Sequence, residues 1–219
     1  MFWEWLASIF YPRQCVLCRK ILPDGQIDLC SSCRAETEDF PKSNYKISFV
    51  AGWTSLWYYN GKVRHSILLY KFYSRRSYGT AYGRLLAMKL HRTAFCQYDI
   101  LTWVPVSPRR KYRRGYDQVE LIARSVGREL GTPAIATMRK IRHTKPQSRL
   151  SSVAQRKANV LGAFRIIDPA AVAGKRILLL DDIITTGATL SECSRVLLTA
   201  GAKEVHCAAV AALNKEKRR

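Results

Sequence analysis

Apolar runs that do not alternate with polar residues mark the expected strands of this chain. Residues 177–180 are four consecutive aliphatic side chains, and residues 100–106 and 205–213 are mostly apolar. Strands covered on both faces of a parallel sheet have this pattern. Further candidate strands are residues 48–59, 134–141 and 161–167.

Helical periodicity separates these runs. One apolar stripe consists of Val119, Ile122, Ala123, Val126 and Leu130, and a second of Leu190, Cys193, Leu197 and Ala200. Gly131 and Gly201 are well placed to end these helices. Residues 63–70 and 82–90 suggest two more helices. The order of elements predicts an α/β fold with an open, mostly parallel sheet and flanking helices on both faces.

Two acids and a small hydroxyl-rich loop follow the run at residues 177–180. Asp181 and Asp182 fall where that strand should end, and the loop before the next helix is Thr185, Thr186, Gly187, Ala188 and Thr189. Amides at a helix N-terminus cradle phosphate, and glycine permits close approach. Paired carboxylates suit a ribose diol or a hydrated Mg²⁺. The segment therefore predicts a phosphoribosyl ligand.

Two polar segments are the other candidates for ligand binding. Residues 107–115 follow the expected strand 100–106 and include five cationic side chains, so they can reach the same ligand beyond the strand ends. We interpret them as a basic loop that binds diphosphate, a nucleic-acid backbone with Tyr112 stacking on a base, or solvent. Residues 143–159 suit either a lid over a charged substrate or a flexible surface loop.

Four of the seven cysteines form two Cys-x-x-Cys pairs, Cys15 with Cys18 and Cys30 with Cys33. This spacing predicts a tetrahedral zinc site, whose four thiolates leave no open position and so give the metal a structural role. Two disulfides are an alternative that a cytoplasmic chain disfavours. A redox pair is another, but neither pair lies at a strand-to-helix junction of a βαβ unit. We expect Cys193 and Cys207 to pack in the core and leave Cys96 unassigned.

Composition bounds the class of protein. The chain has 219 residues, 47% of them hydrophobic, which favours a folded protein with one good core and a small appendage. No apolar run reaches the length of a transmembrane helix, and residues 1–11 lack the features of a signal peptide, so we expect a cytoplasmic protein. The net charge of +21 favours polyanionic partners, nucleic acid above all.

The string from Arg176 to Leu190 closely resembles the phosphoribosyl-pyrophosphate (PRPP) motif of type I phosphoribosyltransferases. Most of the chain resembles the ComF family of competence proteins. Besides the PRPP motif, the resemblance rests on the paired cysteines, Val104-Pro-Val-x-Pro, Arg-Arg-Gly115-Tyr-Asp-Gln118, Arg142-x-Thr144-x-Pro146-Gln147 with Leu150, and Arg156-x-x-Asn159. The family usually has Asn where this chain has Asp117. The resemblance implies a type I phosphoribosyltransferase domain, which we expect at residues 41–219, after a zinc module at residues 1–40.

The resemblance also implies roles by position. Asp181 and Asp182 would bind ribose, and the loop from Thr185 to Thr189 its 5′-phosphate. The diphosphate position would be taken by Ser107, Arg109, Arg110 and Lys111. The flexible loop would include Thr144, Lys145, Gln147, Arg156 and Asn159. ComF relatives are linked to uptake of transforming DNA with a helicase-like partner, and to the gluconate-related GntX.

Two functions remain open on the sequence. One is a PRPP-binding phosphoribosyltransferase-like protein with Mg²⁺ on the diphosphate, for which we assign no catalytic side chain and no acceptor. The other is a module that binds single-stranded DNA, or a PRPP sensor without turnover, in which the zinc module and basic loops contact DNA. The acid motif favours the first, and the net charge with interleaved aromatic residues favours the second.

Overall fold

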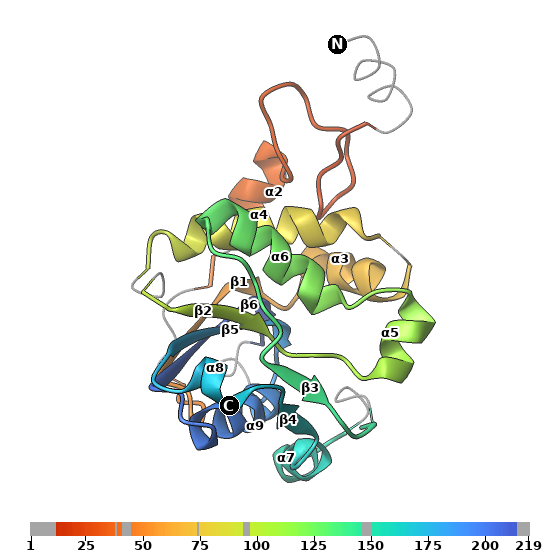
Figure 1. The fold of residues 1–219 in the computed structure, drawn as a ribbon. Coiled ribbons are helices and arrows are strands. Elements are labelled where there is room, and N and C mark those ends of the chain that lie inside the picture. Colours follow the sequence, from red (N-terminus) through yellow and green to blue (C-terminus); the bar gives the residue numbers. More distant parts are fainter. Residues whose placement is uncertain are drawn as a thin grey trace.

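A computed structural model describes residues 12–37, 39–40, 45–73, 75–93, 97–145 and 150–213 (Figure 1). Its strands are β1 (Gly52–Tyr58), β2 (Ile100–Trp103), β3 (Met138–Lys140), β4 (Phe164–Ile166), β5 (Arg176–Ile184) and β6 (Glu204–Ala212). Its helices are α2 (Ser31–Glu36), α3 (Gly61–Phe72), α4 (Ser77–Leu90), α5 (Pro108–Arg114), α6 (Gln118–Leu130), α7 (Val153–Val160), α8 (Pro169–Val172) and α9 (Ala188–Thr199). Within these residues, no helix is both long and apolar enough to cross a bilayer.

The main sheet is parallel, with strand order β1-β6-β5-β2. The aliphatic run of β5 is fully buried, as its pattern predicts. Strand β2 ends with Trp103 beside Leu180, whereas β5 and β6 stay paired as far as Ile184 and Ala212. Asp181 and Asp182 therefore lie inside β5, past the end of β2, and the strand continues beyond the acids that were expected to end it.

Both faces of the sheet are covered (Figure 1). Leu178 and Leu180 face a hydrophobic cluster that includes side chains of α3, α4 and α6. Ile177 and Leu179 face the opposite cluster, which includes side chains of α8, α9 and the β3–β4 ribbon. Alternate side chains of one strand thus enter two cores, which explains the continuous aliphatic run and confirms the predicted α/β architecture.

Two expected features have a different form. Residues 134–141 and 161–167 contribute β3 and β4, which form a separate antiparallel ribbon and do not join the parallel sheet. Their alternation leaves the charged Arg139 and Arg165 at paired positions, with Arg139 exposed. A strand with a charged side cannot be covered on both faces, which explains the separation.

The expected basic loop is largely the helix α5. Pro108 occupies its first turn, arginine and lysine are good helix formers, and Gly115 ends the helix with a φ of 75°. The expected flexible segment 143–159 is also partly helical, because α7 begins at Val153 behind a capping box of Ser152 and Gln155.

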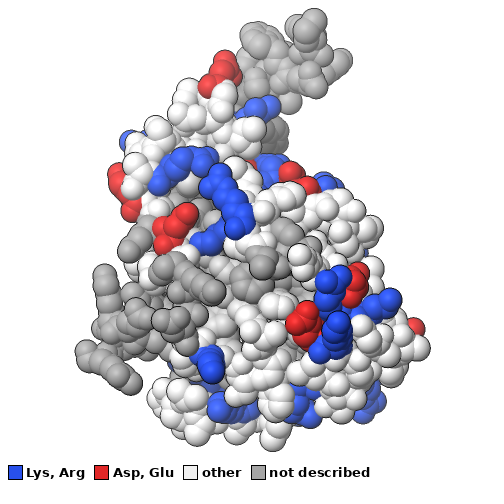
Figure 2. Space-filling view, turned by 90° about the vertical axis from the view of Figure 1, so that its left-hand side faces the viewer, with Lys and Arg blue, Asp and Glu red and all other residues white. Residues whose placement is uncertain are grey.

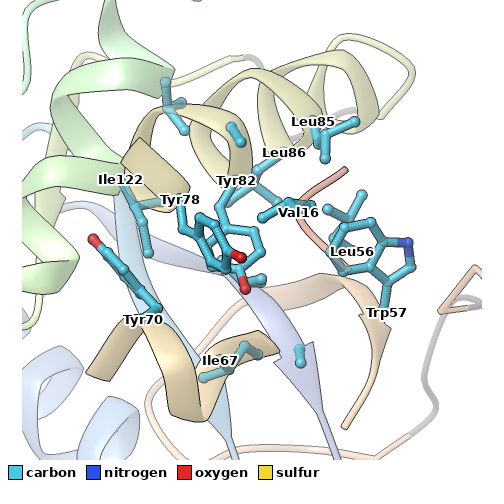
Figure 3. Packing of buried hydrophobic residues seen from close by; sticks show 14 of the residues in the cluster. Val16, Leu56, Trp57, Ile67, Tyr70, Tyr78, Tyr82, Leu85, Leu86 and Ile122 are labelled. Atoms are coloured by element: carbon cyan, nitrogen blue, oxygen red, sulfur yellow. The ribbon is translucent and has the colours of Figure 1, made fainter. Parts of the chain in front are cut away.

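The cysteine-rich module packs directly on the main domain. Val16 and Leu17 are buried in the cluster that contains α3 and α4, and Figure 3 shows Val16 beside Tyr82, Leu86 and Leu56. The Ser66 hydroxyl donates to the carbonyl oxygen of Val16 and lies 2.5 Å from the Tyr82 hydroxyl. One core thus extends across residue 40, and the division at residues 40 and 41 stays a prediction. Residues 1–11 and 41–44 lie outside the described part of the chain.

Candidate functional site

The acid pair of β5 is buried, and its second member, Asp182, is engaged by side chains from two helices. Lys71, near the end of α3, places its ammonium nitrogen 2.8 Å from Asp182 Oδ1. Gln118, the first residue of α6, donates from Nε2 to Asp182 Oδ2 at 3.1 Å. The backbone N–H of Asp182 donates to Asp181 Oδ1 at 2.8 Å. Both carboxylates are thus held in fixed positions past the end of β2.

Cations surround these acids. Burial and then the charge of Asp182 raise the pKa of Asp181, and Lys71 and Lys140 oppose that rise. Burial lowers the pKa of Lys140 to about 8, aided by repulsion from Arg110 and opposed by Asp181. Burial and then the neighbouring Arg114 and Arg113 lower the pKa of Arg110. A site with two acids and at least three nearby cations favours an anionic ligand even when both acids are charged.

The hydroxyl-rich loop joins the end of β5 to the first turn of α9. Gly187 has a φ of 77°, and a Cβ built there would lie 2.9 Å from Ile47 Cδ1, so glycine is required both by conformation and by space. Thr186 Oγ1 accepts from the Ala188 N–H at 3.4 Å, and the Thr186 carbonyl accepts from the Tyr45 hydroxyl at 3.2 Å. The loop is therefore fixed by the segment before β1, while Thr185, Thr186 and Thr189 remain partly exposed.

The expected diphosphate residues divide into two groups. Ser107 is buried and its hydroxyl lies 3.3 Å from His143 Nδ1. Arg110 donates to the carbonyl oxygen of Thr144 at 2.9 Å and interacts electrostatically with Asp182. Arg109 is exposed, and Lys111 forms an exposed ion pair with Glu120 at 3.2 Å. Arg110 is thus the member of this group that interacts electrostatically with Asp182.

The expected flexible-loop residues lie around the β3–β4 ribbon. Thr144 is buried, and the Asn159 side chain both accepts from the Lys145 N–H and donates to its carbonyl, at 3.1 and 3.0 Å. Arg156 donates to the carbonyl oxygen of Leu150 at 3.1 Å. Gln147 lies outside the described residues. The contacts of Asn159 and Arg156 join the two ends of this segment within one folded unit.

Asp117, which stands where ComF relatives usually have Asn, is a helix cap. Its Oδ1 accepts from the N–H groups of Val119 and Glu120, and its Oδ2 accepts from the Val106 N–H. Burial raises the pKa of this carboxyl, and the three backbone hydrogen bonds oppose the rise. The acid thus joins the start of α6 to the segment after β2.

Mg²⁺ does not fit directly on Asp182. Each of its oxygens already accepts from a nitrogen donor, and one of those donors is the ammonium of Lys71. The ammonium charge repels a divalent cation, whereas a neutral hydroxyl can donate to a remaining lone pair of the carboxylate, because each oxygen has two. Of the two ligands that the sequence left open for the acids, the ribose diol suits this arrangement.

The four paired cysteines lie close enough together to hold a metal ion. Their sulfur atoms all lie within 4.8 Å of one another, and Cys18 Sγ is 3.6 Å from Cys30 Sγ. Tetrahedral Zn–S bonds of about 2.3 Å place sulfurs about 3.8 Å apart, so the cluster fits such an ion. Cys193 and Cys207 are fully buried among apolar side chains, as expected, whereas Cys96 lies outside the described residues.

Three residues of the site were not assigned a role from the sequence: Lys71, Gln118 and Lys140. Lys71 could have been noticed as the single cation in the apolar run at residues 67–72. A lysine is rarely buried unless a counter-charge pairs with it, so its position indicated an acidic partner. Gln118 was visible only as part of a family motif. Lys140 had no signal, because its burial depends on the ribbon packing, where its Nζ lies 5.0 Å from the ring centre of Phe164.

Comparisons with known proteins agree with this geometry. A family model described as a phosphoribosyl transferase domain matches residues 117–219. Competence protein F of Haemophilus influenzae is 27% identical over 221 residues, which cover 90% of this chain and 95% of that protein. DNA utilization protein YhgH of Escherichia coli K12 is 36% identical over 140 residues, so this match spans 62% of the chain and 60% of YhgH.

Among solved structures, the glutamine PRPP amidotransferase of B. subtilis is 24% identical, with a TM-score of 0.43 over 64% of this chain and 30% of that one. The sequence matches decide the relationship. Residues 117–219 are similar to a phosphoribosyl transferase domain, a four-cysteine cluster precedes them, and the chain has sequence homology to Competence protein F and YhgH, which confirms its resemblance to the ComF family and its type I phosphoribosyltransferase fold.

Proposed function

We propose that this protein binds PRPP, or a related ribose phosphate, at the carboxyl end of β5. The observation that carries the proposal is the buried acid pair directly before the Gly187 loop and the start of α9, with Asp182 held by Lys71 of α3 and Gln118 of α6. The acids can accept from ribose hydroxyls, and the first-turn amides of α9 can donate to a 5′-phosphate. These two groups occur together in a ribosyl phosphate.

The diphosphate would bind on the cationic side of the site, near Arg110. Guanidinium and ammonium groups neutralise phosphate oxygens, and Mg²⁺ would enter on the diphosphate and not on Asp182. Transfer of the phosphoribosyl group to an acceptor is the reaction class that this arrangement suits, since positioning and stabilisation of the leaving diphosphate supply most of its catalysis.

Calorimetric titration with PRPP and Mg²⁺ tests the binding proposal. The double variant Asp181→Asn/Asp182→Asn should lose most affinity, while the control Asp99→Asn, at the opposite end of β5, should bind as the wild type does. Equal affinity of the double variant and the wild type would refute the site. Pyrophosphate release across a panel of bases and amines then tests turnover, and binding without release identifies a sensor.

A second function, binding of single-stranded DNA, is favoured by exposed aromatic and basic groups. Tyr112 of α5 is exposed, as are Phe72 and Tyr73 at the end of α3. The Arg114 guanidinium lies 5.4 Å from the centre of the Phe72 ring. Between the cysteine module and α4 lies a cleft of about 700 Å³ whose lining includes Arg13, Arg75 and Arg84. Blue cationic side chains also gather in groups on the face shown in Figure 2.

Fluorescence anisotropy with a labelled oligonucleotide tests this second function. Affinity should fall steeply as salt rises, because phosphate contacts release counterions. Tyr112→Ala should weaken binding by about 1–3 kcal/mol if a base stacks on the ring, and Tyr73→Ala tests whether the second exposed tyrosine contributes. Weak binding at low salt, or affinity that is independent of salt, would contradict DNA binding.

The cellular role that we propose is in DNA uptake. It rests on the names of the relatives, Competence protein F and DNA utilization protein YhgH. We further propose the cytoplasmic location and the helicase-like partner that the sequence led us to expect. We propose that zinc fills the cysteine cluster, where reduced thiolates would be its ligands.

A further inference from the structure

Lys71 lies where a divalent cation would have to approach the second acid of the site. Its ammonium nitrogen is 2.8 Å from Asp182 Oδ1, and its side chain is 17% exposed. The residue stands one position before the end of α3, where the helix dipole favours a positive charge. The ion pair thus joins a helix from the N-terminal half of the chain to the central strand of the sheet.

The second oxygen of the same carboxylate is also engaged. Gln118 Nε2 donates to Asp182 Oδ2, and Gln118 is itself 4% exposed. The Asp117 cap fixes the start of α6 and therefore the position of Gln118. A divalent cation on Asp182 would stand close to the Lys71 ammonium and be repelled by its charge, whereas a neutral hydroxyl can use a remaining lone pair without that repulsion.

We infer that Lys71 determines which ligand the acid pair accepts: it holds Asp182 for sugar hydroxyls and excludes divalent cations from that carboxylate. The inference rests on the proposed ribose phosphate site and adds a specificity residue from a helix that the sequence motif does not include. A buried carboxylate without a counter-charge would otherwise attract a hard cation such as Mg²⁺. Lys71 supplies the compensating charge from the protein itself.

The test uses Mn²⁺ as the probe, with its free-ion paramagnetic resonance signal as the readout, on the full chain with its cysteine cluster loaded with zinc. Wild type and Lys71→Arg should show no Mn²⁺ binding that depends on Asp182. Lys71→Met should gain about one Mn²⁺ site per chain, because the acid pair then lacks its counter-ion, and Lys71→Met/Asp182→Asn should lose it again.

Lys62→Met is the matched control, because Lys62 lies on the same helix and forms an exposed ion pair with Glu36. It should behave as the wild type does, and thermal unfolding by circular dichroism verifies that each variant is folded. Asp182-dependent Mn²⁺ binding by the wild type, or no gain in folded Lys71→Met, overturns the inference.

Calorimetry with ribose 5-phosphate on the zinc-loaded protein, in buffer with no added divalent cation, separates this inference from the proposed function. Wild type should bind without added metal, and Lys71→Met should bind about tenfold more weakly, since a charge-assisted hydrogen bond no longer orients Asp182. If the wild type does not bind ribose 5-phosphate or PRPP, the proposed function fails, while the Mn²⁺ experiment still decides the role of Lys71.

Discussion

The carboxylate of Asp117 links helix α6 to Val106, which follows the end of β2. Asp117 Oδ2 accepts from the Val106 N–H at 3.1 Å, while its Oδ1 accepts from the first-turn amides of Val119 and Glu120 at 3.0 and 3.1 Å. One side chain thus caps the helix that carries Gln118 and positions it against the strand edge where the proposed ligand binds.

Asp117→Ala should lower the free energy of unfolding by about 1–3 kcal/mol, because the cap is lost and the Val106 N–H loses its partner. Asp117→Asn should cost less, since its amide oxygen can still cap the helix. Guanidinium denaturation measures both. The exposed cap Asp168→Ala, which serves the short helix α8, should cost less than Asp117→Ala, and equal losses would contradict the linking role.

Gly187→Ala should destabilise the protein and weaken binding of ribose 5-phosphate. Alanine is strained at a φ of 77°, and its Cβ would lie 2.9 Å from Ile47 Cδ1. The expected cost is about 1–3 kcal/mol. Calorimetry and denaturation measure the two effects.

Gly201→Ala is the matched control for Gly187. Gly201 has a φ of 93°, and a Cβ added there would have Ala173 Cβ as its nearest neighbour, at 3.5 Å. The substitution therefore adds backbone strain without a clash, at a position outside the site. Ile47→Ala in the Gly187→Ala background should recover part of the stability. Unchanged ligand binding in Gly187→Ala would show that the loop does not hold the phosphate.

The sequence predicted the centre of the fold better than the ends of its elements. The aliphatic run of β5 can be recognised from its own residues, because a continuous apolar run is typical of a parallel strand that is buried on both faces. The extension of β5 past Asp181 depends on pairing with β6 and was not predicted. Helix α5 was missed because a run of cations indicates exposure and not conformation, although Pro108 and Gly115 were its start and stop signals.

The motif at the acid pair was visible in the sequence, but its surroundings were not. Asp181 and the Gly187 loop are contiguous along the chain, so a linear pattern includes both. Lys71 reaches Asp182 only because α3 packs on the sheet 111 residues earlier in the chain, and a contact of that kind has no local signal. Asp117 has a local role as the N-cap of α6, and that role was in principle visible in the neighbouring sequence. It was noticed instead because ComF relatives usually have Asn at this position.

Loss of the cysteine-bound metal should destabilise the main domain as well as the module. Cys15 and Val16 belong to the same core as Tyr82 and Leu86, so unfolding of the module exposes part of that core. Cys33→Ser should lower the bound zinc from about one ion per chain and lower the unfolding temperature. Metal analysis and calorimetry measure both. Cys193→Ala, a core change remote from the cluster, should keep the metal, and retained zinc in Cys33→Ser would contradict the four-thiolate site.

Asp181 should make the protein less stable as pH rises toward neutrality. Burial, reinforced by the charge of Asp182, raises the pKa of Asp181 to about 8, against 3.8 for an unperturbed Asp. Between these values the folded state holds a proton that the unfolded state has released, so folding stability falls with rising pH, by at most about 1.4 kcal/mol per pH unit. Denaturation at pH 4 to 8 measures this slope.

Asp181→Asn removes the titrating group, so the free energy of unfolding of this variant should fall less between pH 4 and 8 than that of the wild type. The advantage of the variant should be largest at pH 8. Asp99→Asn is the control of opposite sign. A hydrogen bond from the Arg176 side chain lowers the pKa of exposed Asp99 to about 2, so its contribution is present above pH 4 and is lost only as pH falls toward 2. The slope of Asp99→Asn between pH 4 and 8 should therefore match the wild type. A parallel slope for Asp181→Asn would mean that Asp181 is ionised throughout, and that the cations around it outweigh its burial.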